Sequence, residues 1–374
     1  MMYALLFGVV LALAYANGAN DNIKPFATVY GSGVLPYGRA LAFATGAQVA
    51  GSAMSILVAG ALIEAFSGKG FLPDEAIASY GFLVAVGMGA VVAVGIATRL
   101  GIPISTTHSL VGGLAGAGLA FAPAEISWTT LGAVFALPLM LSPGLAMVLV
   151  AALYPITRRL RKVWGIEATT HVVATPKVGL AAMRVDGTAA AIQQGILIGL
   201  EDSETARSSD SSNVFDADAQ RVADVLHLGS AMSLGFARGL NDTPKILGVL
   251  LAANVVGGFN MTVTLVLVAA AMALGGLMHS RRLVHTLGCK ITSINHGQGL
   301  LANAVSSSLV ILASLAGMPV STTHVSSGAI FGIGVWTGDA DWGLVRTILV
   351  AWVVTLPVAA AAAYAMGQSA LFFG

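Results

Sequence analysis

The residues most able to do chemistry in this chain are two Asp–Lys pairs that interrupt apolar sequence. Asp21 stands three residues before Lys24, and Asp242 stands three residues before Lys245. This spacing puts the two side chains of a pair on one face of a helix. A charged group inside hydrocarbon costs about 2.5–3.5 kcal/mol on insertion scales, so such groups are rare there unless they are functional. The pairs predict a buried site that handles an ion.

Both pairs belong to copies of one motif. Residues 18–24 read Gly-Ala-Asn-Asp-Asn-Ile-Lys, and residues 239–245 read Gly-Leu-Asn-Asp-Thr-Pro-Lys. Asn20 and Asn241 supply short side chains that cap a helix end or contact a bound ion. The alternative is that each Asp–Lys pair is only an internal salt bridge that holds the helices together. The repetition of both pairs at equivalent positions favours a shared site.

A second motif, also present twice, is rich in hydroxyl groups. Residues 103–108 and 319–324 both read Pro-x-Ser-Thr-Thr-His. Pro followed by hydroxyl residues is typical of a helix start, where free N–H groups and a partial positive charge suit a phosphate-like anion. Helix capping alone is the competing interpretation, but two copies beside two acidic motifs favour anion binding. The candidate substrate ligands are Ser105, Thr106, Thr107, Ser321, Thr322 and Thr323, together with Lys24, Lys245, Asn20 and Asn241.

Other reactive residues give weaker indications. His108 and His324 end the hydroxyl motifs and are candidates for proton transfer, since imidazole titrates near neutral pH; a neutral His with a structural hydrogen bond is the other interpretation. Arg238 is a candidate substrate contact, although Asn17 stands at the equivalent position of the first motif. Cys289 is the single cysteine, which excludes a multi-cysteine metal site. We expect no metal and no cofactor, and the absence of a Walker motif argues against ATP hydrolysis.

The composition indicates the medium in which these groups lie. Of 374 residues, 56% are hydrophobic and only 9% are charged, and the mean hydropathy is +0.85. A soluble domain carries roughly 25% charged residues, so this chain lacks the polar surface that water requires. We predict an integral, multi-pass protein of the cell (cytoplasmic) membrane, embedded in the lipid bilayer. No basic patch supports nucleic-acid binding.

The elements that must position the motifs are apolar helices in two related halves. Predicted spanning helices cover residues 3–17, 39–66, 77–100, 129–156, 226–253, 261–278, 300–315 and 342–372. Residues 101–122 and 317–336 start with Gly-x-Pro and carry polar groups, which predicts re-entrant hairpins. Pro25 and Pro244 predict that both charged segments are broken helices. The first helix is expected to be retained rather than cleaved as a signal peptide.

The repeat decides the predicted fold class. The charged motifs lie 221 residues apart and the hydroxyl motifs 216 apart, in the same order. Such duplication is typical of secondary transporters with a site at the repeat interface. We predict an all-α membrane protein with two inverted repeats, broken helices and two re-entrant helical hairpins. Residues 1–156 form the N-terminal repeat, 157–225 a Ser- and Asp-rich linker and 226–374 the C-terminal repeat; the basic cluster at Arg158–Lys162 predicts a cytoplasmic linker.

The paired Gly-x-Asn-Asp and Pro-x-Ser-Thr-Thr-His motifs resemble those of the inorganic phosphate transporter family, usually called PiT. The resemblance covers both halves but not the linker. It implies an inverted-repeat fold with two re-entrant hairpins, commonly dimeric, that imports phosphate coupled to sodium or protons. By motif match, Asp21 and Asp242 fall on the ion-coupling acids of the family, and the six Ser and Thr residues fall on its phosphate-binding hairpin tips.

The chain departs from the family motif at two equivalent positions. Lys24 and Lys245 stand where the family has Asn. An ammonium group beside each Asp can take the place of a sodium ion, which predicts transport that is independent of sodium and coupled to protons. The segments 30–33 and 317–320 are similar to a sulfate permease branch that resembles this family. Sulfate is therefore the alternative substrate, because Asp residues neutralised by Lys accommodate either anion.

The sequence and this resemblance together predict a secondary-active transporter of a small tetrahedral oxyanion, with phosphate ranked first, that works by alternating access and is not an enzyme. The resemblance implies that it is a homodimer. Two other classes compete with this interpretation. An anion channel fits the same site if both gates open together. An intramembrane hydrolase that uses Ser105 and His108 is less consistent with a duplicated site, because a single nucleophile needs no second copy.

Overall fold

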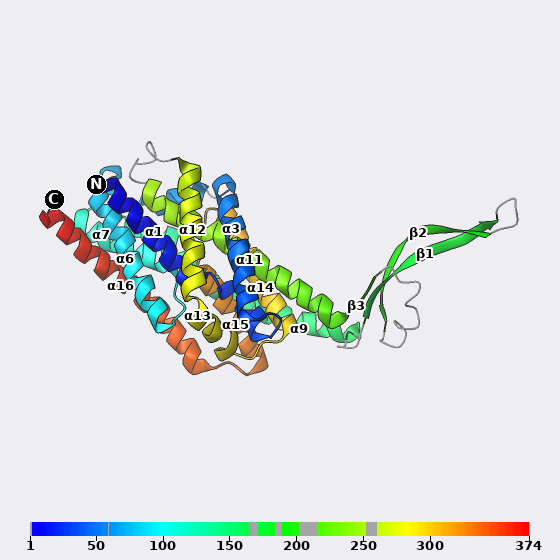
Figure 1. Cartoon of the computed structure of the whole chain (residues 1–374). Helices are drawn as coiled ribbons and strands as arrows, with labels where there is room; N and C mark the ends of the chain where they lie inside the picture. Colours follow the sequence, from blue (N-terminus) through cyan, green and yellow to red (C-terminus); the bar gives the residue numbers. More distant parts are fainter. Residues whose placement is uncertain are drawn as a thin grey trace. The chain divides into compact units, whose positions relative to one another are not determined.

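The computed structural model describes residues 2–58, 60–164, 166, 171–183, 189–201, 215–251 and 260–373. Two compact units are present (Figure 1). The larger, helical unit combines Met1–Ala152 with His227–Gly374, and the smaller unit is Leu153–Leu226. The site predicted from the sequence lies in the helical unit, because both charged motifs and both hydroxyl motifs belong to it.

The first half contributes helices on both sides of the first hydroxyl motif. In chain order they are α1 (Met2–Asp21), the 3-10 turn η1 (Lys24–Phe26), α2 (Ala27–Gly31), α3 (Tyr37–Val58), α4 (Gly60–Phe66), α5 (Asp74–Ile77), α6 (Tyr80–Leu100), α7 (Thr106–Phe121), α8 (Trp128–Thr130), the π-helical turn η2 (Leu131–Ala136) and α9 (Leu137–Val163). The second half contributes α11 (Ala219–Leu251), α12 (Met261–His279), α13 (Arg281–His285), the π-helical turn η4 (Thr286–Lys290), α14 (His296–Leu315), α15 (Thr322–Thr337) and α16 (Trp342–Phe373).

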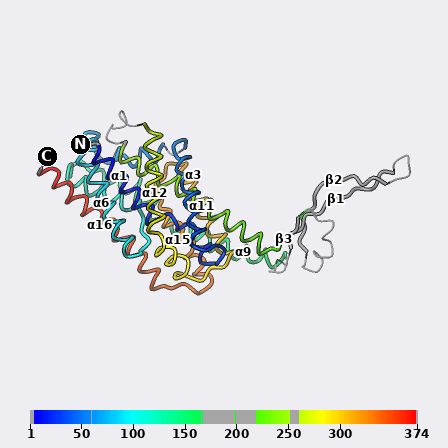
Figure 2. Tube along the Cα trace, viewed as in Figure 1, coloured from blue at the N-terminus to red at the C-terminus, as the bar shows by residue number. Residues whose placement is uncertain are grey.

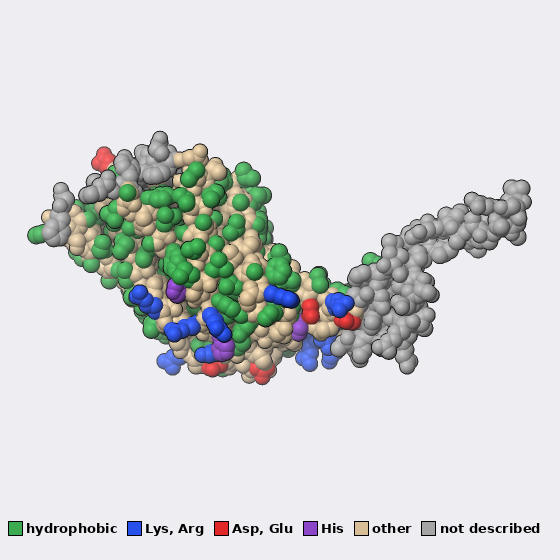
Figure 3. Space-filling view, in the orientation of Figure 1, with side chains coloured by type: hydrophobic (Ala, Val, Ile, Leu, Met, Phe, Trp, Pro, Cys, Tyr) green, Lys and Arg blue, Asp and Glu red, His purple; other side chains and the backbone are tan. Residues whose placement is uncertain are grey.

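Among the described residues, seven helices are long and apolar enough to cross a membrane. They are the segments Ala4–Gly31, Tyr37–Val58, Tyr80–Leu100, Trp128–Val163, Met261–His279, His296–Leu315 and Trp342–Phe372. The visible face of the helical unit is covered largely by hydrophobic side chains (Figure 3), as expected of a surface that meets lipid. The chain is an integral, multi-pass membrane protein, and the predicted helical fold class is confirmed.

Glycines allow helices of the two halves to pack closely against one another. A side chain on Gly18 of α1 would collide with the backbone carbonyl of Met272 in α12, and one on Gly275 of α12 with the carbonyl of Tyr15 in α1. The second half repeats the arrangement, because a side chain on Gly239 of α11 would collide with the backbone of α3. Small residues allow this close approach of membrane helices. Each charged motif therefore packs on a helix from the opposite half (Figure 2).

The two charged motifs differ in backbone structure. Helix α1 ends at Asp21, and the chain continues through η1 and α2, so the predicted break is present at the first motif. At the second motif α11 runs without interruption through Pro244, so the expectation of a break there is wrong. Membrane helices tolerate an interior proline because neighbouring groups compensate for the lost hydrogen bond.

The two hydroxyl motifs have almost the same backbone conformation. Ser105 and Ser321 are the N-cap residues of α7 and α15, with φ/ψ of −101°/116° and −100°/117°. Both helices contain 16 residues, which gives a length of about 24 Å. This is less than the roughly 30 Å of a bilayer core, in keeping with segments that enter a membrane without crossing it. The inversion of the two halves remains a prediction.

The smaller unit contains a three-stranded antiparallel sheet, which the sequence analysis did not anticipate. Its strands are β1 (His171–Met183), β2 (Ala189–Glu201) and β3 (Phe215–Asp218), in the order β2-β1-β3. His171 pairs with Glu201 on one side and with Asp218 on the other. Most of the Ser- and Asp-rich stretch taken as a linker, residues 202–214, lies outside the described residues. The strand segments were missed because charge, rather than local pattern, defined the predicted linker.

Candidate functional site

The carboxylate of Asp21 stands at the end of α1 and accepts hydrogen bonds from both halves of the chain. One oxygen, Oδ1, contacts Lys24 Nζ and accepts from Thr323 Oγ1 at 3.2 Å. The other, Oδ2, accepts from Thr106 Oγ1 at 2.9 Å and from Asn17 Nδ2 at 3.1 Å. Asp21 is 2% exposed. A carboxylate this deep is stabilised only by such a complete set of donors.

The ammonium group of Lys24 lies in a cage of oxygen atoms. Besides Asp21, Nζ donates to Asn20 Oδ1 at 2.8 Å, to the carbonyl of Ile104 at 2.9 Å and to Thr323 Oγ1 at 2.8 Å. Carboxylate, amide, carbonyl and hydroxyl oxygens are the ligands that hard metal cations prefer. The oxygen atoms that surround this ammonium group are therefore also suited to bind a metal cation.

Lys245 occupies the equivalent place in the second half. Its Nζ donates to Thr107 Oγ1 at 2.8 Å and to the carbonyl of Val320 at 2.5 Å, and it lies 3.7 Å from Asp242 Oδ1. Ile104 and Val320 precede the two N-cap serines by one residue. Each lysine thus contacts the carbonyl before the hydroxyl helix of its own half and a threonine from the helix of the other half.

The motif asparagines fix the hairpin backbones beside the charged pairs. Asn20 Oδ1 accepts from Ile104 N at 3.3 Å, and Asn241 Nδ2 donates to the carbonyl of Val320 at 3.2 Å. The outer contacts match as well. Asn20 donates to Thr98 Oγ1 at 3.0 Å, and Asn241 accepts from Ser314 Oγ at 3.1 Å. Both asparagines are buried, so they orient the site rather than line a surface.

Asn17 and Arg238 join the two charged pairs; the sequence identified Arg238 as a candidate substrate contact but assigned no role to Asn17. Arg238 Nη2 donates to Asn17 Oδ1 at 2.5 Å, and its Nε lies 3.5 Å from Asp242 Oδ2. Asn17 Nδ2 lies within hydrogen-bond distance of both carboxylates, at 3.1 Å from Asp21 and 3.2 Å from Asp242. The 221-residue repeat pairs position 17 with position 238, and extension of the motif by one residue identifies them.

The candidate hydroxyl residues have different places in the site. Ser105 Oγ accepts from His108 N at 3.1 Å and Ser321 Oγ from His324 N at 3.2 Å, so both serines cap their helices. Thr106, Thr107 and Thr323 contact the charged pairs directly. Thr322 is 8% exposed and has no hydrogen bond to another described side chain. The structure brings the threonines of both helices to the charged residues and leaves the serines as caps.

His108 and His324 lie in the first turns of α7 and α15, and their rings are close together. Their ring centroids are 4.4 Å apart, and His324 also stacks on Trp352 at 3.8 Å. Nδ1 of His108 has no hydrogen-bond partner among the described residues. Because neither ring contacts Asp21 or Asp242 in the hydrogen bonds of the described residues, the proton-transfer assignment stays a prediction.

The buried charges leave the site positive. In the described part of the chain, the buried Asp, Lys and Arg side chains are Asp21, Asp242, Lys24, Lys245 and Arg238. Their formal charges sum to +1. No group of three or more His, Cys, Asp or Glu side chains in this part is placed to hold a metal ion. The arrangement suits an anion, since a buried cation without an equal countercharge favours one.

Comparison with known proteins agrees with the motifs. A model of the phosphate transporter family matches residues 17–363. A protein of Rhizobium meliloti named as a low-affinity inorganic phosphate transporter is 30% identical over 368 residues, covering 95% of this chain and 92% of its own. A protein of Pyrococcus abyssi named as a phosphate permease is 28% identical, covering 96% and 95%. A solved structure titled "The sodium-dependent phosphate transporter" superposes with a TM-score of 0.77 at 20% identity, covering both chains fully.

Proposed function

The chain belongs to the phosphate transporter family. From this premise we propose that it is a secondary-active transporter of a small tetrahedral oxyanion, and that phosphate is the first candidate substrate. It works by alternating access in the cell membrane, is coupled to protons and does not need sodium. A homodimer is the proposed assembly. The proposal assigns no enzymatic role to the chain.

One observation carries the sodium-independent part of the proposal, namely the oxygen cage around Lys24. Four oxygens contact its Nζ, from Asp21, Asn20, Ile104 and Thr323. Lys245 has a similar, looser set. A tethered ammonium cannot leave, so it supplies permanently the positive charge that a bound sodium ion would bring and release. Binding of the anion then needs no added cation.

The hydroxyl helices provide the proposed anion site. The N-terminal threonines of α7 and α15 reach the charged residues from opposite halves, and a helix N-terminus suits an anion. Thr322 has a hydroxyl available for it, and Arg238 adds the unmatched positive charge. Substrate enters by exchanging bonds with Thr106, Thr107 and Thr323, which in this structure contact the protein's own charges.

Sulfate is the second candidate substrate, and the environment of Asp21 favours it. Both oxygens of this carboxylate already accept hydrogen bonds from protein donors. Neither oxygen of this carboxylate is therefore free of protein donors to accept a hydrogen bond from the proton that phosphate keeps near neutral pH. Sulfate has no such proton, so its binding does not require a free acceptor. Proton coupling then depends on a group outside the Asp21 cage, and His108 is the candidate.

Uptake into proteoliposomes tests the proposal. Purified protein is reconstituted, and initial rates of radiolabelled phosphate and sulfate entry are measured in sodium or choline buffer, with and without an inward proton gradient. We expect saturable phosphate uptake that the proton gradient increases and that sodium leaves unchanged. Uptake that stops in choline contradicts the role of the lysines. Flux that follows only the electrochemical gradient of the anion, without coupling, indicates a channel instead.

A further inference from the structure

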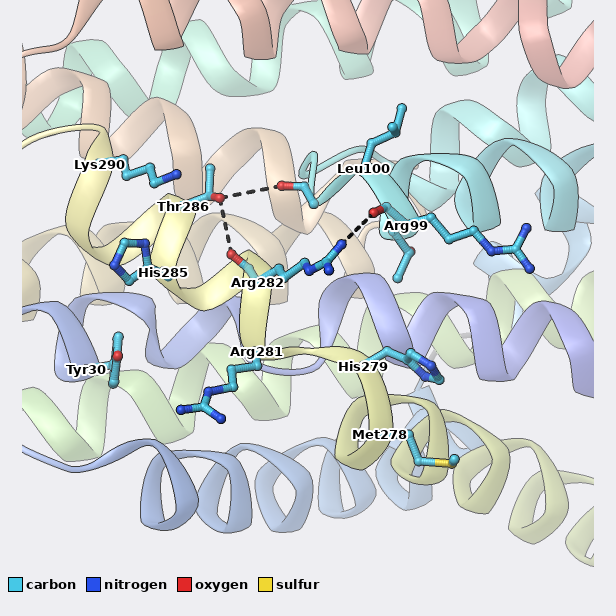
Figure 4. Close-up of a pocket in the computed structure, with 12 residues that line it drawn as sticks. Tyr30, Arg99, Leu100, Met278, His279, Arg281, Arg282, His285, Thr286 and Lys290 are labelled. Carbon is cyan, nitrogen blue, oxygen red and sulfur yellow. Dashed lines mark hydrogen bonds between the residues drawn. The ribbon is translucent and has the colours of Figure 1, made fainter.

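A cationic hollow that shares no lining residue with the charged pairs lies at the ends of α6 and α12. Its volume is about 890 Å³, and its lining includes Arg99 from the end of α6, Arg281 and Arg282 from α13, and Lys290 from η4. Figure 4 shows these side chains around the hollow together with His285. No Asp or Glu belongs to the lining as the structure describes it. The hollow therefore has a strongly positive wall.

The cations of this wall remain available to a ligand. Arg99, Arg281, Arg282 and Lys290 are exposed, and none of them forms an ion pair with a carboxylate in the described part of the chain. Arg282 Nη1 donates to the backbone carbonyl of Arg99 at 3.1 Å, which holds its guanidinium in place. Arg281 lies 5.9 Å from the centroid of the Tyr37 ring. Grouped cations of this kind attract phosphate groups.

An apolar hollow of about 720 Å³ adjoins the cationic one. Ala12, Ala16 and Ala19 of α1 form one wall, and Val91, Val92 and Ile96 of α6 form another. Thr98, Arg99 and His279 line both hollows. Helices α1, α6 and α12 are candidate membrane spans, so the apolar hollow faces hydrocarbon while the cationic one lies at their ends.

We propose that the two hollows together bind one anionic phospholipid, with an acyl chain along α1 and α6 and the phosphate among Arg281, Arg282 and Lys290. Lys and Arg near the ends of spans are typical of the cytoplasmic side, where the leaflet carries anionic lipids. A free phosphate ion would use the cations but gain nothing from the apolar walls. Because Thr98, Arg99 and His279 line both hollows, one lipid can place its phosphate in the first and an acyl chain in the second.

The site also adjoins the wall of the transport site. Thr98, which lines both hollows, accepts a hydrogen bond from Asn20, and Asn20 accepts one from Lys24. A bound lipid would therefore contact a residue that supports the oxygen cage. The proposal does not depend on which anion is transported, because it concerns lipid binding alone.

Native mass spectrometry of the full chain in nanodiscs tests the proposal. The discs contain phosphatidylglycerol and phosphatidylcholine in equal amounts, and retained lipid is counted after release from the disc. We expect wild type to retain phosphatidylglycerol selectively. The double variant Arg281→Gln/Lys290→Gln should retain about tenfold less phosphatidylglycerol, because two of the basic groups that attract an anionic headgroup are removed. Both side chains are exposed and neither donates a hydrogen bond to another described residue, so we expect the variant to fold.

A second variant tests the apolar part. Gly95 lines the apolar hollow, and a Cβ at this position meets open space, so Gly95→Leu fills the hollow without a clash. It should also lose phosphatidylglycerol. The matched controls are Gly46→Leu in α3, where a Cβ also meets open space, and Arg158→Gln/Arg159→Gln, which removes two exposed charges from α9. Both controls should retain lipid as wild type does.

Three results would overturn the proposal. Equal retention by wild type and the Arg281/Lys290 variant would remove the cationic wall from lipid binding. Unchanged retention by Gly95→Leu would show that no acyl chain occupies the apolar hollow. Displacement of phosphatidylglycerol by inorganic phosphate in the buffer would identify the hollow as a site for a free anion. None of these three outcomes depends on transport activity, because each is measured as lipid retained by the protein.

Discussion

Lys24 Nζ donates a 2.8 Å hydrogen bond to Oγ1 of Thr323, a residue from the opposite half of the chain. The equivalent bond is present from the second half to the first, where Lys245 Nζ donates to Thr107 Oγ1 at 2.8 Å. Each half thus supplies the ammonium for the other half's hydroxyl helix. A conformational change that moves one half relative to the other must change both contacts, which makes these bonds the natural test of the proposed mechanism.

Replacement of either lysine should abolish uptake or make it depend on an external cation. Removal of one partner from a buried ion pair costs about 3–5 kcal/mol, so we expect Lys24→Ala or Lys245→Ala to reduce uptake in choline by at least about a hundredfold. Proteoliposome assays in choline and in sodium measure the effect. Lys69→Ala removes a lysine from an exposed pair with Glu64 and serves as the control. Normal uptake by both single variants would exclude the lysines from the mechanism.

Lys24→Asn tests whether the cage accepts a metal ion. The substitution removes the ammonium but leaves the oxygens of Asp21, Asn20, Ile104 and Thr323 in place. We expect uptake by this variant to increase with sodium concentration, whereas wild type does not respond. A variant that is inactive at every sodium concentration, although it is folded by size-exclusion chromatography, would argue against a cation site at this position.

The threonine contacts between the halves should contribute to substrate affinity. Thr107→Val and Thr323→Val remove a hydroxyl with little change of shape, and each leaves a buried ammonium with one fewer acceptor. The expected loss is about 1–3 kcal/mol, seen as an affinity for substrate that is about five- to 150-fold weaker. A double-mutant cycle of Lys24→Ala with Thr323→Val should show non-additive effects. Additive effects would mean that the 2.8 Å contact carries no coupling.

Arg238 should control anion affinity through its charge. It is 1% exposed and carries the positive charge that Asp21 and Asp242 leave unmatched. Arg238→Gln retains a donor for Asn17 but removes the charge, so we expect a higher KM for phosphate with smaller effects on the maximal rate. Arg238→Lys should restore part of the affinity. Equal KM values for Arg238→Gln and wild type would assign Arg238 a structural role alone.

The glycine contacts between the halves should matter for folding rather than for chemistry. A side chain on Gly18 or Gly239 would collide with backbone atoms of the opposite half, whereas one on Gly46 meets open space. Gly239→Val should therefore lower the midpoint of thermal unfolding by several degrees or prevent expression, since overpacking costs about 1–3 kcal/mol. Gly46→Val should have little effect. Thermal unfolding followed by fluorescence compares the two variants, and equal midpoints would contradict the close packing.

The sequence identified most of the site because the site is duplicated. Repetition of the charged and hydroxyl motifs singled out Asp21, Lys24 and their counterparts, and the low charge content identified the membrane. Two contributions to the site could not be predicted from the sequence. The Ile104 and Val320 carbonyls act through the backbone, which has no signature in residue type. The Asn17–Arg238 contact joins different residue types at equivalent positions, so a search for identical residues passes over it.

The helical breaks show a similar limit. A proline predicts a break from local chemistry, and near Pro25 the helix does end. Near Pro244 the helix continues, because packing of α11 against its neighbours decides the outcome. The sheet of the smaller unit was missed for the opposite reason, since a charge-rich segment was interpreted by composition and its strand pattern was not considered.

Phosphate binding to the purified protein, titrated by calorimetry in sodium buffer and in choline buffer, tests the central claim most directly. If the ammonium groups of Lys24 and Lys245 already fill the cation positions, the Kd for phosphate will be the same in both buffers. A Kd that is about tenfold lower in sodium, equivalent to about 1.4 kcal/mol of coupling, would show that a sodium ion still binds with the anion and would contradict the account.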